Sequence, residues 1–292
     1  MAGGSIPRGG GVSPSQQMKM PRARRATPTP SVEGGRVHPT ALVHPKARLA
    51  EGASIGPYSV IDEHVTIGPG TKVGAHCVIE GRTTIGADCE IFTGAVIGSI
   101  PQDLKYQGEE SVLVIGDRNK IREYVTINPG TKGGGGKTVI GSDCLLMAYS
   151  HVAHDCLIGH YVIIANSAAL AGHITVEDRA IIGGLVGIHQ FVRVGTLAFI
   201  GGCSRVAQDV APYATCVGYP AKVFGLNSEG MRRAGVSNEA KQHLHRAFKI
   251  LFHSKLSMSH ALEQAEQGAH HSPEVQHLIA FIRQSKRGVC RA

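Results

Sequence analysis

His151 and His154 lie three residues apart in the segment MAYSHVAHDCLIGH, and Asp155 directly follows the second histidine. An imidazole can bind a metal ion, or it can take up a proton near neutral pH because its reference pKa is about 6.5. A neighbouring carboxylate can orient the ring in either role. The helical zinc motif HExxH is absent from this segment. The local spacing is therefore compatible with a metal site, a proton-transfer site, or polar residues on a strand.

A period of six residues runs through the chain and indicates the elements that must hold these side chains. Every sixth residue is aliphatic from Val37 to Ile97, again at Ile115 in the same phase, and in a new phase from Ile140 to Val206. Neither the period of an α-helix nor the alternation of an ordinary strand gives this spacing. Hexapeptide repeats of this kind are typical of a parallel β-helix, in which each repeat supplies one short strand and one turn. The predicted fold class is mainly β.

The same period predicts which histidines lie close together. A coil of three six-residue repeats takes about 18 residues, and His173 follows His154 by 19 residues. These two side chains should be neighbours on adjacent coils, and His189 lies in the coil after that. One histidine on a β-helix is most often a polar surface residue, whereas a cluster that recurs coil by coil indicates a site.

Two interruptions of the period, at residues 98–114 and 128–139, predict loops that protrude from the regular stack. Such insertions usually carry function, because the repeat itself is committed to packing. The second interruption contains GTKGGGGKT, which nearly matches a phosphate-binding loop. Thr131 stands where that motif needs its first glycine, and no helix pattern follows, which argues against binding of a nucleoside triphosphate there.

The chain is predicted to have three parts, of which the β-helix covers residues 33–224. After Gly225 the six-residue period gives way to helix patterns, which extend over residues 225–292. Serines suited to begin three helices are Ser237, Ser257 or Ser259, and Ser272, with Pro273 at the first position of the last helix. We expect these helices to cover the end of the β-helix, where open strand edges would invite aggregation.

Residues 1–32 form the remaining part and carry five basic residues and no acidic residue. They contain many small residues and prolines but no apolar core of the kind found in secretory signals. This composition is typical of an organelle transit peptide, and the alternative is a disordered tail. We expect import into the mitochondrion, because arginine outweighs the hydroxyl residues that a plastid signal would favour. Plastid and cytoplasm are the alternative locations.

The net charge of +8 is concentrated at the two ends of the chain. Nucleic acid is a poor partner, because aromatic and basic residues do not interleave as a stacking surface. No apolar run approaches the roughly 20 residues that a transmembrane helix needs. Seven cysteines without a CxxC pair argue against a complete disulfide framework. Four of them follow a repeat aliphatic by four positions and should be small core residues: Cys77, Cys89, Cys144 and Cys156.

Residues 37–287 resemble the UDP-N-acetylglucosamine O-acyltransferases that start lipid A biosynthesis. The matching motifs are PQDLKY at 101–106, HVAHDC at 151–156, LAGH at 170–173, IHQF at 188–191, GGCSRVAQDV at 201–210 and GLNSEGMRR at 225–233. The resemblance implies a left-handed β-helix, a homotrimer, and active sites between neighbouring subunits.

The resemblance also implies a reaction, in which an (R)-3-hydroxyacyl group such as 3-hydroxymyristoyl moves to the glucosamine 3-hydroxyl. The acyl donor is an acyl carrier protein, and no metal or cofactor other than its phosphopantetheine arm is implied. His154 matches the family's general base, Asp155 its orienting carboxylate, and Gly172 the residue whose backbone N–H stabilises the oxyanion. General-base catalysis typically contributes about 10²–10⁴-fold and one oxyanion donor about 10²–10³-fold.

Substrate-binding roles carry over in the same way. The resemblance assigns the sugar, acyl and nucleotide contacts to Gln102, Asp103, Lys105, His151, His173, His189, Gln190, Asn227, Glu229 and Arg233. Gly202 matches the residue that limits acyl length, and glycine there goes with a long chain. The chain departs from the family pattern at Tyr219-Pro220, where Asn-His is usual, and at Ala234, where a second basic residue is common. These departures leave the uridine contacts open.

Other interpretations compete with the acyltransferase. A γ-type carbonic anhydrase is a trimeric β-helix that binds zinc through histidines, but its His-x4-His pair is missing here. A non-catalytic β-helix subunit would not need His154, Asp155, Gly172 and Lys105 together. The excess of basic residues in 225–292 suits docking of an acidic acyl carrier protein, and the alternative is a solvated surface.

Overall fold

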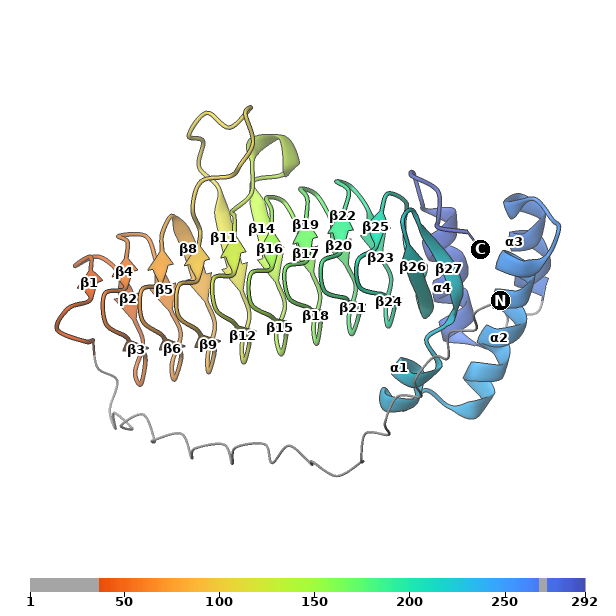
Figure 1. The fold of residues 1–292 in the computed structure, drawn as a ribbon, viewed down its shortest axis with the longest axis horizontal. Helices are drawn as coiled ribbons and strands as arrows, with labels where there is room; N and C mark the ends of the chain where they lie inside the picture. The colour runs from red at the N-terminus through yellow and green to blue at the C-terminus, as the bar shows by residue number, and fades with distance from the viewer. Residues whose placement is uncertain (1–36, 268–271, 292) are drawn as a thin grey trace, which may run out of the picture. The chain divides into compact units, whose positions relative to one another are not determined.

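The computed structural model describes residues 37–267 and 272–291, which form a left-handed parallel β-helix followed by helices (Figure 1). Each coil contributes one short strand to each of three parallel sheets. Most paired strands lie 18 residues apart, as in the register of His151 with Ala169, and the spacing grows to 25 or 30 residues where an interruption of the repeat intervenes. The expected targeting segment, residues 1–32, lies outside the described residues.

Successive strands along the chain belong to the first, second and third sheet in turn, and this order repeats with each coil. The first sheet consists of β1 (Leu42–Val43), β4 (Val60–Ile61), β7 (Val78–Ile79), β10 (Val96–Ile97), β13 (Thr126–Ile127), β16 (His151–Val152), β19 (Ala169–Leu170), β22 (Gly187–Ile188) and β25 (Arg205–Val206). The second consists of β2 (Arg48–Leu49), β5 (Thr66–Ile67), β8 (Arg82–Ile85), β11 (Val112–Ile115), β14 (Lys137–Ile140), β17 (Leu157–Ile158), β20 (Thr175–Val176) and β23 (Arg193–Val194). The third consists of β3 (Ser54–Ile55), β6 (Lys72–Val73), β9 (Glu90–Ile91), β12 (Lys120–Ile121), β15 (Leu145–Leu146), β18 (Ile163–Ile164), β21 (Ile181–Ile182), β24 (Phe199–Ile200), β26 (Ala214–Gly218) and β27 (Ala221–Leu226).

The core is the stack of repeat aliphatic side chains inside the coil. Ile67, Ile97 and Ile127 have no exposed surface, whereas the residue before each of them faces outward. The four cysteines predicted as core residues are at most 1% exposed, which confirms that prediction. Because the interior is filled in this way, chemistry is left to the turns and to the outward-facing strand positions.

The two predicted loops are shorter than the sequence pattern indicated. β11 begins at Val112 and β14 at Lys137, inside the segments 98–114 and 128–139 that were assigned to loops. The reason is an extended ladder, in which Val112 pairs with both Arg82 and Lys137. The protruding segments are residues 98–111, the first loop, and residues 128–136, the second loop, which contains a short 3₁₀-helix at Lys132–Gly134.

The β-helix ends in an antiparallel hairpin, β26–β27, which the sequence analysis did not predict. The boundary expected after residue 224 falls within β27. The described residues after it contain four helices: α1 (Ser228–Arg233), α2 (Asn238–His253), α3 (Met258–Gln267) and α4 (Pro273–Arg283). Ser237 caps α2 through its side chain, as expected, whereas α1 was not predicted. Among the helices of the described residues, none has the length and apolarity needed to cross a membrane.

The C-terminal helices are tied to the last coils by polar contacts as well as by apolar packing. Nε2 of His277 on α4 lies 2.7 Å from Oε2 of Glu177, which follows β20. The hydroxyl of Ser285 donates to the buried carboxylate of Asp209 over 2.7 Å. These contacts fix α4 against the end of the β-helix.

Candidate active site

The candidate residues gather at one corner of the β-helix, formed by the turns that lead from the first sheet to the second. The corner comprises the first loop, the second loop and the turns 153–156, 171–174 and 189–192. Because these turns succeed one another coil by coil, the two loops stand beside the histidine-bearing turns. Figure 1 shows the loops side by side next to β11 and β14, and the backbone N–H of Lys132 donates to Glu109 over 3.1 Å.

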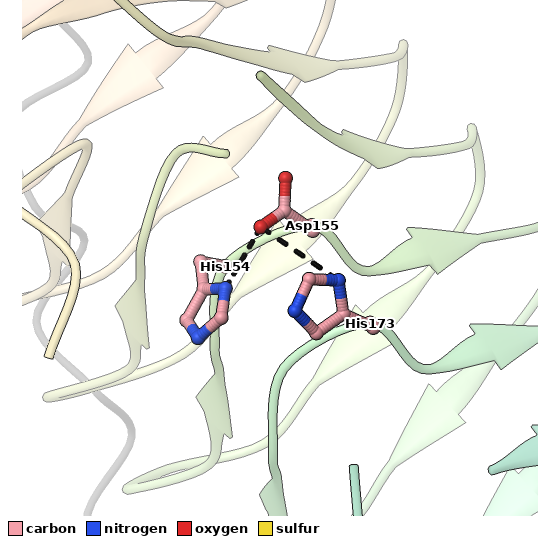
Figure 2. A group of neighbouring side chains, drawn as sticks. All are labelled: His154, Asp155 and His173. Atoms are coloured by element: carbon pink, nitrogen blue, oxygen red, sulfur yellow. Dashed lines mark hydrogen bonds and ion pairs between the residues drawn. The ribbon is translucent and has the colours of Figure 1, made fainter. Parts of the chain in front are cut away.

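A histidine–aspartate pair lies at the centre of this corner (Figure 2). Nδ1 of His154 lies 2.8 Å from Oδ2 of Asp155, and the side chains are 13% and 1% exposed. Nδ1 of His173, on the next coil, lies 3.9 Å from the same oxygen. The two rings meet edge to face with their centroids 5.0 Å apart, which confirms the predicted proximity of His154 and His173.

Asp155 is held by the second loop. The backbone N–H of Thr131 donates to Oδ1 over 2.9 Å, and the Thr131 hydroxyl donates to Oδ2 over 2.6 Å. The N–H of Asp155 itself donates to the hydroxyl of Thr138 over 2.8 Å. A buried carboxylate with this many donors has little freedom to rotate, and it is compensated for its lost hydration.

Gly172 occupies the turn position that corresponds to His154 on the next coil. A Cβ atom at Gly172 would lie 2.5 Å from Cε1 and 2.6 Å from Nε2 of His154, so any larger residue there would displace the ring. Within the described residues, no acceptor pairs with the Gly172 N–H. Figure 2 shows Nε2 of His154 pointing away from the carboxylate. A free ring nitrogen and a free backbone donor therefore lie side by side.

His173 closes one side of a cavity of about 680 Å³ between the two loops. Its ring stacks on Phe191, with the centroids 4.3 Å apart and the planes within 7°. Asp103 and Lys105 of the first loop line the same cavity, as does Thr131. Burial lowers the pKa of His173, and His154 lowers it further, although Asp155 acts in the opposite direction. The ring is thus biased toward the neutral form.

The other predicted residues of the corner lie around this centre. His151 is on β16, where Nδ1 lies 2.7 Å from the hydroxyl of Thr126, and burial lowers its pKa. His189 is exposed, and its Nδ1 lies 3.3 Å from the guanidinium of Arg287. Gln102 and Gln190 are also exposed, and no hydrogen bond holds either side chain within the described part of the chain.

Asn227, Glu229 and Arg233 are brought together at α1. The amide of Asn227 donates to the carbonyl of Leu197 over 2.8 Å and accepts from the N–H of Gly230, so this side chain caps the helix. Arg233 and Arg232 both bind Glu229 over 2.7 Å and lower its pKa to about 2. In the described residues, no hydrogen bond or ion pair joins this group to the histidine corner.

Gly202 lies at the other edge of the first sheet, in the turn between β24 and β25. A Cβ atom there would meet only the carbonyl of Gly184, at 3.2 Å, and its backbone N at 3.9 Å. Tyr219 is exposed near the tip of the terminal hairpin, with Arg205 over its ring at 5.6 Å. The predicted acyl-length residue and the predicted base thus flank one sheet from opposite sides.

His154, Asp155 and His173 could together hold a metal ion, since one ligand atom from each lies within 4.8 Å of the others. Both carboxylate oxygens, however, already accept hydrogen bonds from Thr131, and Oδ2 also accepts from His154. This saturated carboxylate suits orientation of an imidazole better than it suits metal coordination.

Three residues of the site were missed by the sequence analysis. Thr131 was considered only as a mismatch to a phosphate-binding loop, and Thr138 was not considered. Phe191 could have been found, because it follows His173 by one coil of 18 residues and therefore stacks on it.

A left-handed β-helix of this kind, with polar side chains gathered at one corner, places the chain in the hexapeptide-repeat class. The model of bacterial transferase hexapeptide repeats matches residues 46–81 and 137–172. The model of domain 2 of UDP N-acetylglucosamine O-acyltransferase matches residues 209–290. The chain belongs to the UDP-N-acetylglucosamine O-acyltransferase family.

Membership of the family rests on similarity along most of the chain. The acyl-[acyl-carrier-protein]–UDP-N-acetylglucosamine O-acyltransferase of Myxococcus xanthus is 54% identical over 257 residues, covering 87% of this chain and 99% of that protein. The enzyme of the same name from Anaeromyxobacter dehalogenans is 52% identical over 255 residues, with the same coverage. The crystal structure of LpxA from Acinetobacter baumannii has a TM-score of 0.85 at 44% identity and covers 87% of this chain and 99% of its own.

Proposed function

We propose that this chain is an acyltransferase that moves an (R)-3-hydroxyacyl group from acyl carrier protein to the 3-hydroxyl of UDP-N-acetylglucosamine, the first step of lipid A biosynthesis. Relatives that match 87% of the chain are named for the acyl carrier protein and for UDP-N-acetylglucosamine. The observation that carries the proposal is the His154–Asp155 pair beside the free N–H of Gly172. Acyl transfer needs both a base and an oxyanion donor at adjacent positions.

In the proposed mechanism, Nε2 of His154 removes the proton of the sugar hydroxyl as the oxygen attacks the thioester carbonyl. Asp155 accepts a hydrogen bond from Nδ1, which keeps Nε2 unprotonated before the reaction and stabilises the imidazolium afterwards. The N–H of Gly172 donates to the oxyanion of the tetrahedral intermediate. Collapse of the intermediate breaks the carbon–sulfur bond, and the departing phosphopantetheine thiolate takes the proton from His154.

The acyl donor and the sugar would bind around the cavity of the corner. We assign Gln102, Asp103 and Lys105 of the first loop to the substrate, because two of them line the cavity beside His173. His151, His189 and Gln190 extend the binding surface along neighbouring coils. Gly202 leaves space for a long acyl chain at the far edge of the first sheet, and we propose 3-hydroxymyristoyl as the preferred group.

A homotrimer would complete the site. Glu229 and Arg233 on α1 are the proposed nucleotide contacts, with Arg233 as the phosphate partner, yet no polar contact in the described part of the chain joins them to His154. Two separate groups of side chains can bind one substrate if the histidine corner of one subunit faces α1 of a neighbouring subunit. Asn227 then acts by fixing the start of α1, since its amide is already hydrogen bonded.

Docking of acyl carrier protein is proposed at residues 225–292, where basic residues outnumber acidic ones two to one. Electrostatic attraction of an acidic partner speeds association and weakens with salt. Import into the mitochondrion rests on the composition of residues 1–32 alone and is retained as a proposal.

The experiment that tests the function is acyl transfer by the purified protein to UDP-N-acetylglucosamine from a panel of 3-hydroxyacyl carrier proteins. We expect an ester at the sugar 3-hydroxyl. Zinc analysis of the same preparation tests the alternative zinc enzyme, which the group His154, Asp155 and His173 motivates. Stoichiometric zinc together with no acyl transfer would overturn the acyltransferase.

A further inference from the structure

We propose that Thr131 of the second loop is a positioning residue that determines which of two histidines is paired with the carboxylate of Asp155. The inference deepens the proposed function and rests on it, because it concerns the base of that reaction. The pairing of His154 rather than His173 with the carboxylate is the property that Thr131 would control.

The carboxylate of Asp155 has two imidazoles within reach. Its Oδ2 lies 2.8 Å from Nδ1 of His154 and 3.9 Å from Nδ1 of His173, which is beyond hydrogen-bond distance. If the carboxylate were free to rotate, a modest rotation would let it accept a hydrogen bond from His173 instead. The difference between the two rings is therefore set by whatever fixes that rotation.

Thr131 fixes it through both carboxylate oxygens. Its N–H donates to Oδ1 and its hydroxyl donates to Oδ2, and the residue is 5% exposed. Two donors from one residue, one on each oxygen, define the plane of the acceptor as well as its position. The lone pair left at Oδ2 is the one that faces His154.

The glycines of the second loop allow this contact. A Cβ atom at Gly134 would lie 2.0 Å from Cγ of Asp155, so the loop backbone rests directly on the carboxylate. Gly135 has φ 97° and Gly136 has φ 74°, a left-handed conformation that suits glycine. The loop thus covers Asp155, while stacking on Phe191 holds His173 in its own place.

The first test is a set of threonine variants. Thr131→Val removes the hydroxyl and keeps the shape, and we expect kcat to fall by about 10-fold with KM unchanged, as for other partners that orient a functional histidine. Thr131→Ser should restore most of the rate. The matched control is Thr71→Val, because the buried hydroxyl of Thr71 makes two hydrogen bonds, to Gly86 and Cys89, several coils away. A fall in kcat with Thr71→Val as large as with Thr131→Val would overturn the proposal.

A double-mutant cycle shows whether Thr131 acts through Asp155. We expect Thr131→Val to lower kcat by less than about 2-fold in the Asp155→Asn background, because the two changes disable one interaction. Independent, multiplicative losses would overturn the proposal.

The ring nitrogens of His154 give a readout that does not depend on turnover. In ¹⁵N spectra of histidine-labelled protein, assigned with His154→Gln, the wild type should show one tautomer with the proton on Nδ1. Thr131→Val should give a mixture, and an unchanged tautomer would contradict the positioning role. If His154→Ala stays active, the proposed base is wrong, but this spectroscopic result still decides the role of Thr131.

Discussion

The imidazole of His154 lies directly against Gly172 on the next coil, with room for a hydrogen atom but not for a methyl group. We expect Gly172→Ala to lower acyl transfer by at least about 10²-fold, because the methyl displaces the ring and moves the backbone donor. The circular dichroism spectrum and the size of the protein in gel filtration should stay unchanged. An alanine variant of near-normal activity would show that the ring can shift without cost, and the geometry proposed for the oxyanion would then be wrong.

His154→Ala should fold normally, because the aliphatic stack holds the coils together, and should lose at least about 10²-fold in transfer rate. His160→Ala is the matched control. His160 is an exposed turn residue at another corner, where its Nδ1 accepts from the N–H of Ser142. Comparable losses in both variants would point to a general effect on the fold and not to a base.

Gly202→Met should shift the preferred donor from a long acyl chain to a shorter one. A Cβ atom at Gly202 would meet only the carbonyl and the backbone N of Gly184, so a methionine side chain can be accommodated with a small adjustment and would occupy the space proposed for the end of the acyl chain. Each methylene excluded from an apolar groove costs about 0.8 kcal/mol, and a few of them change specificity by orders of magnitude. The measurement is kcat/KM across donors of different length. Retention of the long-chain preference would place the end of the groove elsewhere.

His277 should make stability depend on pH. The hydrogen bond that His277 donates to the Glu177 carboxylate raises the pKa of His277, whereas burial opposes the shift. A histidine whose pKa is raised in the folded state stabilises the fold at pH values below the ordinary histidine pKa. This contribution is lost as the pH rises through the folded-state pKa. Burial raises the pKa of Glu177, but hydrogen bonds from His277 and the Thr196 N–H outweigh it, so the net pKa is lowered. The contribution of Glu177 is lost as the pH falls through that lowered value.

The expected consequence is a smaller pH dependence of the melting temperature in His277→Gln. The drop in melting temperature from pH 5.5 to pH 8.5 should be larger for the wild type than for the variant. The reason is that only the wild type has a charged pair to lose between these pH values. Equal differences in the two proteins would show that protonation of His277 beside Glu177 does not contribute to stability.

Much of the fold could be predicted from the chain because a hexapeptide repeat is a local code. An aliphatic residue at each sixth position specifies a strand and a turn without reference to distant residues, and the length of a coil then makes His154 and His173 neighbours. The small cysteines at fixed offsets follow from the same rule. The terminal hairpin could not be predicted in this way, because β26 and β27 leave the repeat and pair antiparallel with each other.

By itself, the sequence determined the β-helix, the place of the two interruptions in it, and the approach of the histidines. Only the tertiary structure decided how the carboxylate is oriented. Thr131 and Asp155 are 24 residues apart and belong to a loop and a turn whose contact no period encodes. It likewise decided that Asn227 caps a helix and that Gly202 and His154 flank opposite edges of one sheet. Periodic packing is encoded by the residue type at each local position, whereas hydrogen bonds between a loop and a turn form only when the tertiary fold has brought both backbones together.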